Sequence, residues 1–157
     1  MTKVGTFLEL ANAPENVARA DAWAGWLQSQ DWQRFCTFTT GYELTLPGAR
    51  RLMERFHDRI SHKIFSDPVR LFWVAERFEA KDGYHTHGLL DYNPAEAERG
   101  GYDAMEVMTE SFQIVSAARK HDKRYRVALN RYNAKRAAGR YCSKYLLKRC
   151  ADFDMLV

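Results

Sequence analysis

Apolar side chains follow two spacings along the chain, one typical of helices and one typical of strands. Spacings of three and four residues predict amphipathic helices. They occur after Pro14, at Val17, Ala20, Trp23 and Leu27; after Pro47, at Leu52, Phe56 and Ile60; and at Met105, Met108, Phe112 and Val115. The second of these helices is expected to end before Asp67-Pro68, and an alanine-, lysine- and arginine-rich helix is expected over residues 134–149.

Runs of β-branched and aromatic residues predict the strands. Residues 35–39 form one run, and residues 124–129 form a short one. Two longer runs, residues 69–78 and 84–92, flank the turn-forming Lys81-Asp82-Gly83 and predict a β-hairpin. Three or four helices with at least three and up to five strands indicate an α+β fold, in which helices flank a central antiparallel sheet.

The composition is that of one folded domain. The chain has 157 residues, 46% of them hydrophobic, with only four prolines and nine glycines. This length can bury a sizeable core but is too short for two full domains. Since neither an internal repeat nor a Ser/Gly/Pro-rich linker is present, we place no boundary within residues 1–157.

Cysteine usage and hydropathy indicate a compartment. Cys36, Cys142 and Cys150 include no C-x-x-C pair, which argues against a disulfide framework and a zinc ribbon. The longest uncharged run covers the nine residues 22–30, too few for a membrane span, and no signal-peptide pattern is present. We therefore expect a cytoplasmic protein without a membrane partner.

Charge is distributed very unevenly along the chain. The net charge is +4, yet residues 119–149 hold twelve of the 24 Lys and Arg residues and one acidic residue, Asp122. That segment carries +11, so the remainder carries −7. A solvated helix face would explain some of these cations, but so many like charges repel one another unless a polyanion neutralises them. The segment therefore favours a nucleic-acid partner.

A candidate metal site lies in the predicted hairpin. Side chains alternate between the faces of a strand, so His85 and His87 share a face. If the loop is residues 80–83, Glu76 opposes His87; if it is residues 82–83, Glu76 opposes Leu89. In both registers Glu76 shares the histidine face and Glu79 does not. Two imidazoles and a carboxylate suit a divalent ion with open positions, although two half-exposed histidines without a metal remain an alternative.

Two tyrosines lie four residues apart in the last predicted helix. This spacing places Tyr141 and Tyr145 on one face, with Lys144 one turn from Tyr141. A tyrosine becomes a nucleophile when its proton is removed or a nearby cation stabilises its phenolate, which Lys144 could do. The alternative is an aromatic stripe that packs the helix on the sheet.

These motifs, in this order, resemble the HUH endonuclease superfamily, the rolling-circle replication initiators and their relatives. Residues 35–39 are similar to the first family motif, a strand ending in Thr. Glu76 followed by residues 82–90 (DGYHTHGLL) is similar to the metal-binding motif, with Thr86 where the family has a bulky apolar residue. Residues 141–145 (YCSKY) are similar to the third motif, in the paired-tyrosine form of phage gene A-type initiators.

The resemblance implies a five-stranded antiparallel sheet with the metal ligands at its centre and the tyrosine helix beside it. Glu76, His85 and His87 would hold Mg²⁺ or Mn²⁺, and Tyr141 would attack single-stranded DNA to form a 5′-phosphotyrosine. Tyr145 would perform a second cleavage, and Lys144 would stabilise charge. The cations expected to contact the DNA backbone are Arg124, Arg136, Arg140 and Lys148.

The resemblance also bears on partners and alternatives. No G-x-x-x-x-G-K-[ST] motif is present, so the resemblance implies that a separate helicase unwinds the DNA. It also implies a phage- or plasmid-encoded protein in a bacterial or archaeal host cell. A transposase or plasmid relaxase with the same motifs is the nearer alternative, and a nucleic-acid-binding module that does not cut is the more distant one.

Overall fold

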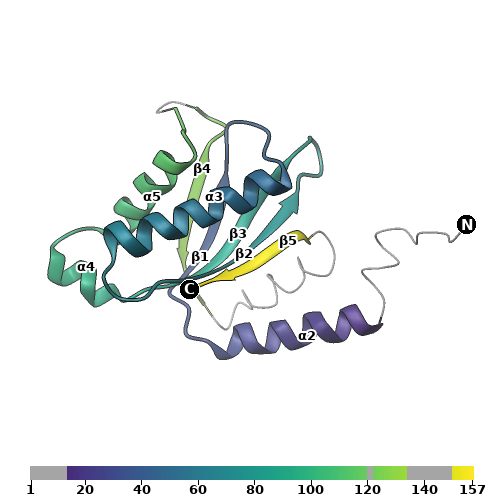
Figure 1. Ribbon diagram of the computed structural model, residues 1–157, viewed down its shortest axis with the longest axis horizontal. Coiled ribbons are helices and arrows are strands. Elements are labelled where there is room, and N and C mark those ends of the chain that lie inside the picture. The colour runs from purple at the N-terminus through teal and green to yellow at the C-terminus, as the bar shows by residue number, and fades with distance from the viewer. Residues whose placement is uncertain (1–13, 120–121, 134–149) are drawn as a thin grey trace, which may run out of the picture.

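The computed structural model describes residues 14–119, 122–133 and 150–157, and these residues build an antiparallel sheet with helices on both faces (Figure 1). The strand order is β4-β1-β3-β2-β5, and each neighbouring pair is antiparallel. The strands are β1 (Arg34–Thr39), β2 (Arg70–Arg77), β3 (Tyr84–Asp91), β4 (Arg126–Arg131) and β5 (Cys150–Leu156). The predicted α+β class and antiparallel sheet of about five strands are confirmed.

Side chains that cap the first turn mark the start of most of the described helices. They are α2 (Pro14–Ser29), α3 (Leu46–Arg59), which continues as a π-helix (Ile60–Ile64), α4 (Pro94–Gly100) and α5 (Ala104–Val115). Thr45 caps α3 by accepting a hydrogen bond from the backbone N–H of Gly48, and Pro47 lies in its first turn. The carboxylate of Asp103 caps α5 in the same way. Apolar spacing predicted both helices, and these caps explain where α3 and α5 begin.

Two described elements were not predicted. Helix α4 has only seven residues and lacks an extended apolar periodicity, so its spacing carries little signal. Strand β5 alternates apolar residues with Asp152 and Asp154, and aspartate is depleted in strands. The guanidinium of Arg50 on α3 offsets this preference by pairing with both carboxylates, at 2.7 and 2.6 Å. A long-range ion pair of this kind leaves no trace in local sequence.

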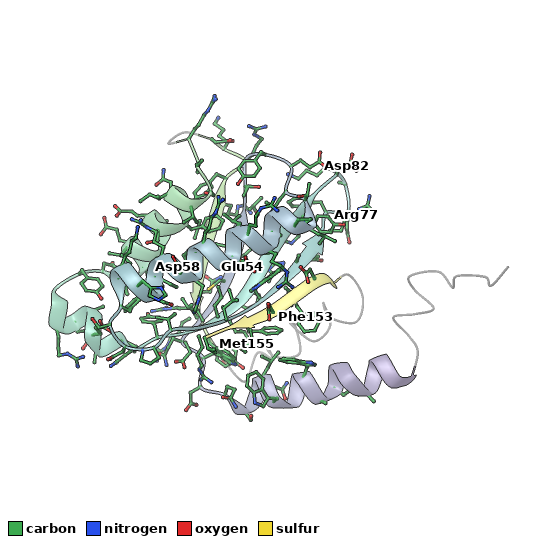
Figure 2. All side chains as sticks on the ribbon, in the orientation of Figure 1. Glu54, Asp58, Arg77, Asp82, Phe153 and Met155 are labelled. Carbon is green, nitrogen blue, oxygen red and sulfur yellow. The ribbon has the colours of Figure 1, made fainter. Side chains whose placement is uncertain are left out.

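The sheet buries different side chains on its two faces. Helices α3 and α5 cover one face, where Phe38 of β1 contacts the rings of Phe56 and Phe112. On the opposite face, Leu27 and Trp32, within and just after α2, pack with Phe72, Val74 and Leu89. Figure 1 shows α2 on the side of the sheet away from α3, and Figure 2 shows Phe153 and Met155 of β5 projecting toward α2.

Helix α2 packs against only one end of its sheet face. Phe72 and Leu89, which it helps to bury, pair with each other across β2 and β3. At the other end of the same two strands Glu76 pairs with His85. The fold therefore places a polar group of side chains on the α2 face of the sheet, beyond the apolar cluster. Among the described helices, none combines the length and apolar character needed to cross a membrane.

Candidate metal centre

Glu76, His85 and His87 meet on the central strand and its neighbour. His85 and His87 lie on β3, the middle strand of the sheet, and Glu76 lies on the adjacent β2. Because Glu76 pairs directly with His85, and His87 is two residues further along β3, all three side chains share one face. The predicted ligand set is thus brought together on two central neighbouring strands, at the end of these strands beside the β2–β3 turn.

The pairing register differs from both predicted registers. Arg77 opposes Tyr84, and Glu76 opposes His85. Both predicted partners of Glu76, His87 and Leu89, were therefore wrong. The N–H of Phe78 donates to the carbonyl of Gly83 at 3.1 Å, which leaves a four-residue tip, and Gly83 adopts a φ of +94°. The observed register is displaced by two residues from the nearer prediction. An even displacement keeps every side chain on its face. The prediction that Glu76 shares a face with His85 and His87 is therefore confirmed.

The ligand atoms are spaced as a metal ion requires. One oxygen of Glu76, Oε2, lies 3.0 Å from His85 Nε2 and 2.9 Å from His87 Nε2. Allowing one ligand atom from each residue, all three atoms lie within 4.8 Å of one another. Adjacent ligands on an octahedral ion with bonds of about 2.0–2.1 Å lie about 2.9 Å apart. The three residues therefore fit a metal ion, for which they supply two nitrogen atoms and one oxygen atom.

Burial prepares both imidazoles for this role. Glu76 and His87 are buried, and the His85 side chain is 17% exposed. Burial lowers the pKa of His87 well below its ordinary value, and His85 contributes to this effect. Burial also lowers the pKa of His85, with a smaller contribution from the Lys81 ammonium. Because a metal ion binds the neutral imidazole, both histidines present the form that coordinates at neutral pH.

The two histidines have different surroundings. Thr37 on β1 opposes His87, and its hydroxyl lies 3.1 Å from His87 Nδ1. This contact lets Nδ1–H donate to the hydroxyl and leaves the Nε2 lone pair directed at the ligand cluster, as an outer partner of a metal ligand does. The Phe35 ring stacks on the His87 ring, with centroids 5.9 Å apart. His87 is therefore held by groups that do not themselves reach the cluster.

Among the described residues, none is an outer partner of this kind for His85. Its Nδ1 is buried and makes no hydrogen bond within the described structure. The ring instead packs against Phe78, with centroids 4.7 Å apart, and over Phe78 lies the Lys81 ammonium at 4.1 Å. Thr37, Phe78 and Lys81 were not predicted as site residues. Thr37 and Phe35 occur in the first motif of the resemblance, but their contacts with His87 depend on the β1–β3 register, which local sequence does not supply.

An irregularity in the sheet lies next to Glu76. Along β2 and β5, Ala75 pairs with Asp152 and Glu76 pairs with Cys150, so the register shifts between Ala75 and Glu76. Such bulges bend a strand and change the direction of neighbouring side chains. The backbone of Cys150, the first residue of β5, thus adjoins the strand position that carries the carboxylate ligand.

Most of the other predicted site residues lie outside the described residues. These are Tyr141, Lys144 and Tyr145 of the third motif, and the basic residues Arg136, Arg140 and Lys148. Arg124 is described: it is exposed in the turn before β4 and forms a two-point ion pair with Asp122, at 3.1 Å through Nε. Arg126, two residues later, pairs with Thr39 at the sheet end that carries His85.

The chemistry of the site is therefore defined by its geometry. Two neutral imidazoles and one carboxylate, gathered on a sheet face and partly shielded from water, could hold a metal ion and leave positions for a second molecule. Neither the protein-family models, nor the curated proteins, nor the solved structures include a match to this chain.

Proposed function

We propose that the protein is a metal-dependent single-stranded DNA endonuclease and strand transferase that initiates rolling-circle replication, as the resemblance to HUH endonucleases implies. The observation that carries the proposal is the cluster of Glu76, His85 and His87 on the two central neighbours β2 and β3. A non-catalytic nucleic-acid-binding sheet has no need for one buried and one partly buried imidazole that converge on one carboxylate oxygen.

The proposed reaction is a transesterification. The Tyr141 oxygen attacks the scissile phosphorus, the new O–P bond forms as the P–O3′ bond breaks, the phenol loses its proton and the leaving 3′ oxygen gains one. The product is a 5′-phosphotyrosine and a free 3′-hydroxyl that can prime synthesis. Because one phosphodiester replaces another, the reverse attack by a 3′-hydroxyl rejoins DNA without ATP.

Glu76, His85 and His87 are the residues that would hold the metal ion, which we propose to be Mg²⁺ or Mn²⁺. The ion would draw charge from the scissile phosphate and so favour attack at phosphorus. Of the two, Mn²⁺ tolerates imidazole ligands better, because Mg²⁺ prefers oxygen. Thr37 holds His87 in the orientation that this role needs.

The chain path supports a role for the third motif near this cluster. Tyr141 precedes Cys150 by nine residues, and the backbone of Cys150 pairs with Glu76. The first described residue after the segment with Tyr141, Lys144 and Tyr145 is thus Cys150, whose backbone pairs with the candidate ligand Glu76. In the proposal Lys144 stabilises the developing charge, and Tyr145 performs the second cleavage.

The proposal also assigns partners. Single-stranded DNA is the substrate, and the basic segment around Arg136, Arg140 and Lys148 contacts its backbone, together with Arg124 at the end of the sheet. A separate helicase supplies the single strand, since the chain lacks a nucleotide-binding P-loop motif.

Covalent capture of DNA tests the proposal. The protein is incubated with an end-labelled library of single-stranded oligonucleotides and Mn²⁺, and the products are separated on a denaturing gel. We expect a labelled protein–DNA adduct that disappears with EDTA, with Glu76→Gln and with Tyr141→Phe. Tyr102→Phe is the matched control, because Tyr102 packs on Phe65 at the turn between α4 and α5, and it should keep the adduct.

Two other outcomes are informative. Binding of DNA without an adduct under Mg²⁺ and Mn²⁺ would contradict the proposal and favour a non-catalytic nucleic-acid-binding module. An adduct that persists in Tyr141→Phe and disappears only when Tyr145→Phe is added would show that either tyrosine can attack.

A further inference from the structure

The turn between β2 and β3 places a positive charge near the ligand cluster, which consists of Glu76, His85 and His87. The Lys81 ammonium lies over the ring of Phe78, 4.1 Å from its centroid. Phe78 in turn packs against the His85 ring, with centroids 4.7 Å apart. The three side chains form a stack that runs from the exposed Lys81 to His85, one of the three candidate metal ligands. An anion bound at the cluster would therefore lie near Lys81.

The charge of Lys81 is not neutralised within the described structure. Asp82, its neighbour, lies 3.8 Å from the guanidinium of Arg77, and Figure 2 shows both side chains at the tip of this hairpin. None of the described carboxylates forms an ion pair with Lys81, which is exposed. The Lys81 ammonium is thus available to bind an anion, although it lies one aromatic ring away from His85.

The turn holds this lysine in a defined place. The hydrogen bond from Phe78 N–H to Gly83 O closes the base of the turn, and the positive φ of Gly83 favours glycine at that position. Phe78 is half-buried against His85, so its ring is a fixed platform for the ammonium. A cation held over an aromatic face loses less freedom when it meets an anion.

We propose that Lys81 contacts a phosphate of the DNA strand next to the scissile phosphate, with Phe78 as its platform. This inference rests on the proposed function and names a substrate contact outside the three motifs. Lys81 is suited to a phosphate because an ammonium is a compact charge with three donors on a flexible stem. The contact would orient the strand across the cluster and would not alter the ligands themselves.

The salt dependence of DNA binding tests the inference. Affinity for a single-stranded oligonucleotide is measured between 50 and 200 mM salt, chosen as the range in which counterion release is readily observed, for the wild type, Lys81→Gln and Lys81→Arg. One phosphate contact contributes about 0.7 to the slope of log affinity against log salt. We expect Lys81→Gln to lose about this much slope and about fivefold in affinity, and Lys81→Arg to restore the slope.

Matched controls separate binding from folding and from the metal. Lys63→Gln removes an exposed lysine of the π-helix that follows α3, and it should leave the slope unchanged. The affinity of Lys81→Gln for Mn²⁺ alone should stay within twofold of the wild type or become tighter, because a like charge is removed. Phe78→Leu keeps the charge but removes the ring, and it should weaken DNA binding less than Lys81→Gln.

The failure of this inference differs from the failure of the proposed function. A wild type that binds DNA and forms the adduct, with Lys81→Gln indistinguishable from Lys63→Gln, would overturn the role of Lys81 alone. A wild type that binds no single-stranded DNA at any salt concentration would overturn the proposed function and this contact with it.

Discussion

The two faces of the sheet share the same strands yet have opposite character. On the α3 face, Trp73, Phe38, Phe56 and Phe112 are fully buried and form a continuous apolar core. On the α2 face, the same strands carry apolar residues at one end and Glu76, His85 and His87 at the other. The α3 face is therefore mainly apolar, whereas the α2 face combines an apolar cluster with polar groups held at fixed positions.

This division has a physical cause. Burying aromatic rings between α3 and the sheet stabilises the fold in proportion to the apolar area removed from water. Burying two imidazoles and a carboxylate opposes folding unless they bind one another or a ligand. The cluster is tolerated because rigid strands hold it and because the opposite face supplies the stability. Variants on the two faces should thus separate stability from binding.

The largest expected effect is on the α3 face. Phe56 contacts Phe38 and Phe112 at centroid distances of 5.1 and 5.8 Å and is fully buried. Phe56→Ala should lower the free energy of unfolding by about 3–5 kcal/mol, measured by urea denaturation, because a cavity remains. Phe56→Leu should lose less. A loss below about 1 kcal/mol would contradict the view that this face provides the stability.

The next largest effect concerns the candidate metal site, where a substitution should reduce Mn²⁺ affinity and leave stability nearly unchanged. Glu76→Gln removes the charged ligand while preserving shape, so the affinity for Mn²⁺, measured by titration calorimetry, should fall by more than the roughly 100-fold limit typical of an outer contact. The midpoint of urea unfolding without metal should change little. Glu54→Gln, on the exposed side of α3 (Figure 2), is the control and should bind Mn²⁺ normally. Equal affinities for the two variants would eliminate Glu76 as a ligand.

A third effect concerns pH. Because burial lowers the pKa of His85 and His87 in the folded protein, the unfolded chain binds more protons once the pH falls below the ordinary histidine value of about 6.5. The free energy of unfolding without metal should therefore be highest above that pH. Below it, this free energy should fall by up to about 1.4 kcal/mol per pH unit for each histidine.

Urea denaturation between about pH 7.5 and about pH 5.5, roughly one unit above and one unit below the ordinary histidine pKa, checks this expectation. Replacing His85 and His87 together by Gln should flatten the profile. A double variant with the same profile as the wild type would show that these histidines do not set the pH dependence.

The smallest effect distinguishes the two histidines. Thr37→Val removes the hydroxyl that lies 3.1 Å from His87 Nδ1, and it should weaken Mn²⁺ binding about 10-fold, the lower limit for an outer contact. Thr37→Ser should restore the affinity. Nitrogen NMR shifts of His87 should show more of the tautomer with Nε2 protonated in Thr37→Val. Unchanged shifts and affinity would leave Thr37 a purely structural residue.

The sequence predicted much of the fold and the ligand set, and the reasons are local. Apolar spacing located α3 and α5, with Pro47 marking the start of α3. Alternation placed Glu76, His85 and His87 on one face whichever loop joined β2 to β3. The actual register was not predictable, because a turn with Phe78 against His85 competes with shorter loops. Strand β5 was also missed, because its pairing depends on Arg50, about a hundred residues earlier in the chain.

By itself, then, the sequence determined the periodicity, the faces of the strands and the residue types of a candidate metal site, because these depend on neighbours within a few residues. Only the tertiary structure decided that β3 is the central strand, that Thr37 holds His87, and that Lys81 lies over Phe78 beside His85. The first two relations join strands that are distant in sequence, and they form only when the core on the α3 face brings those strands together. The third joins residues of one hairpin and depends on the register that the β2–β3 pairing adopts.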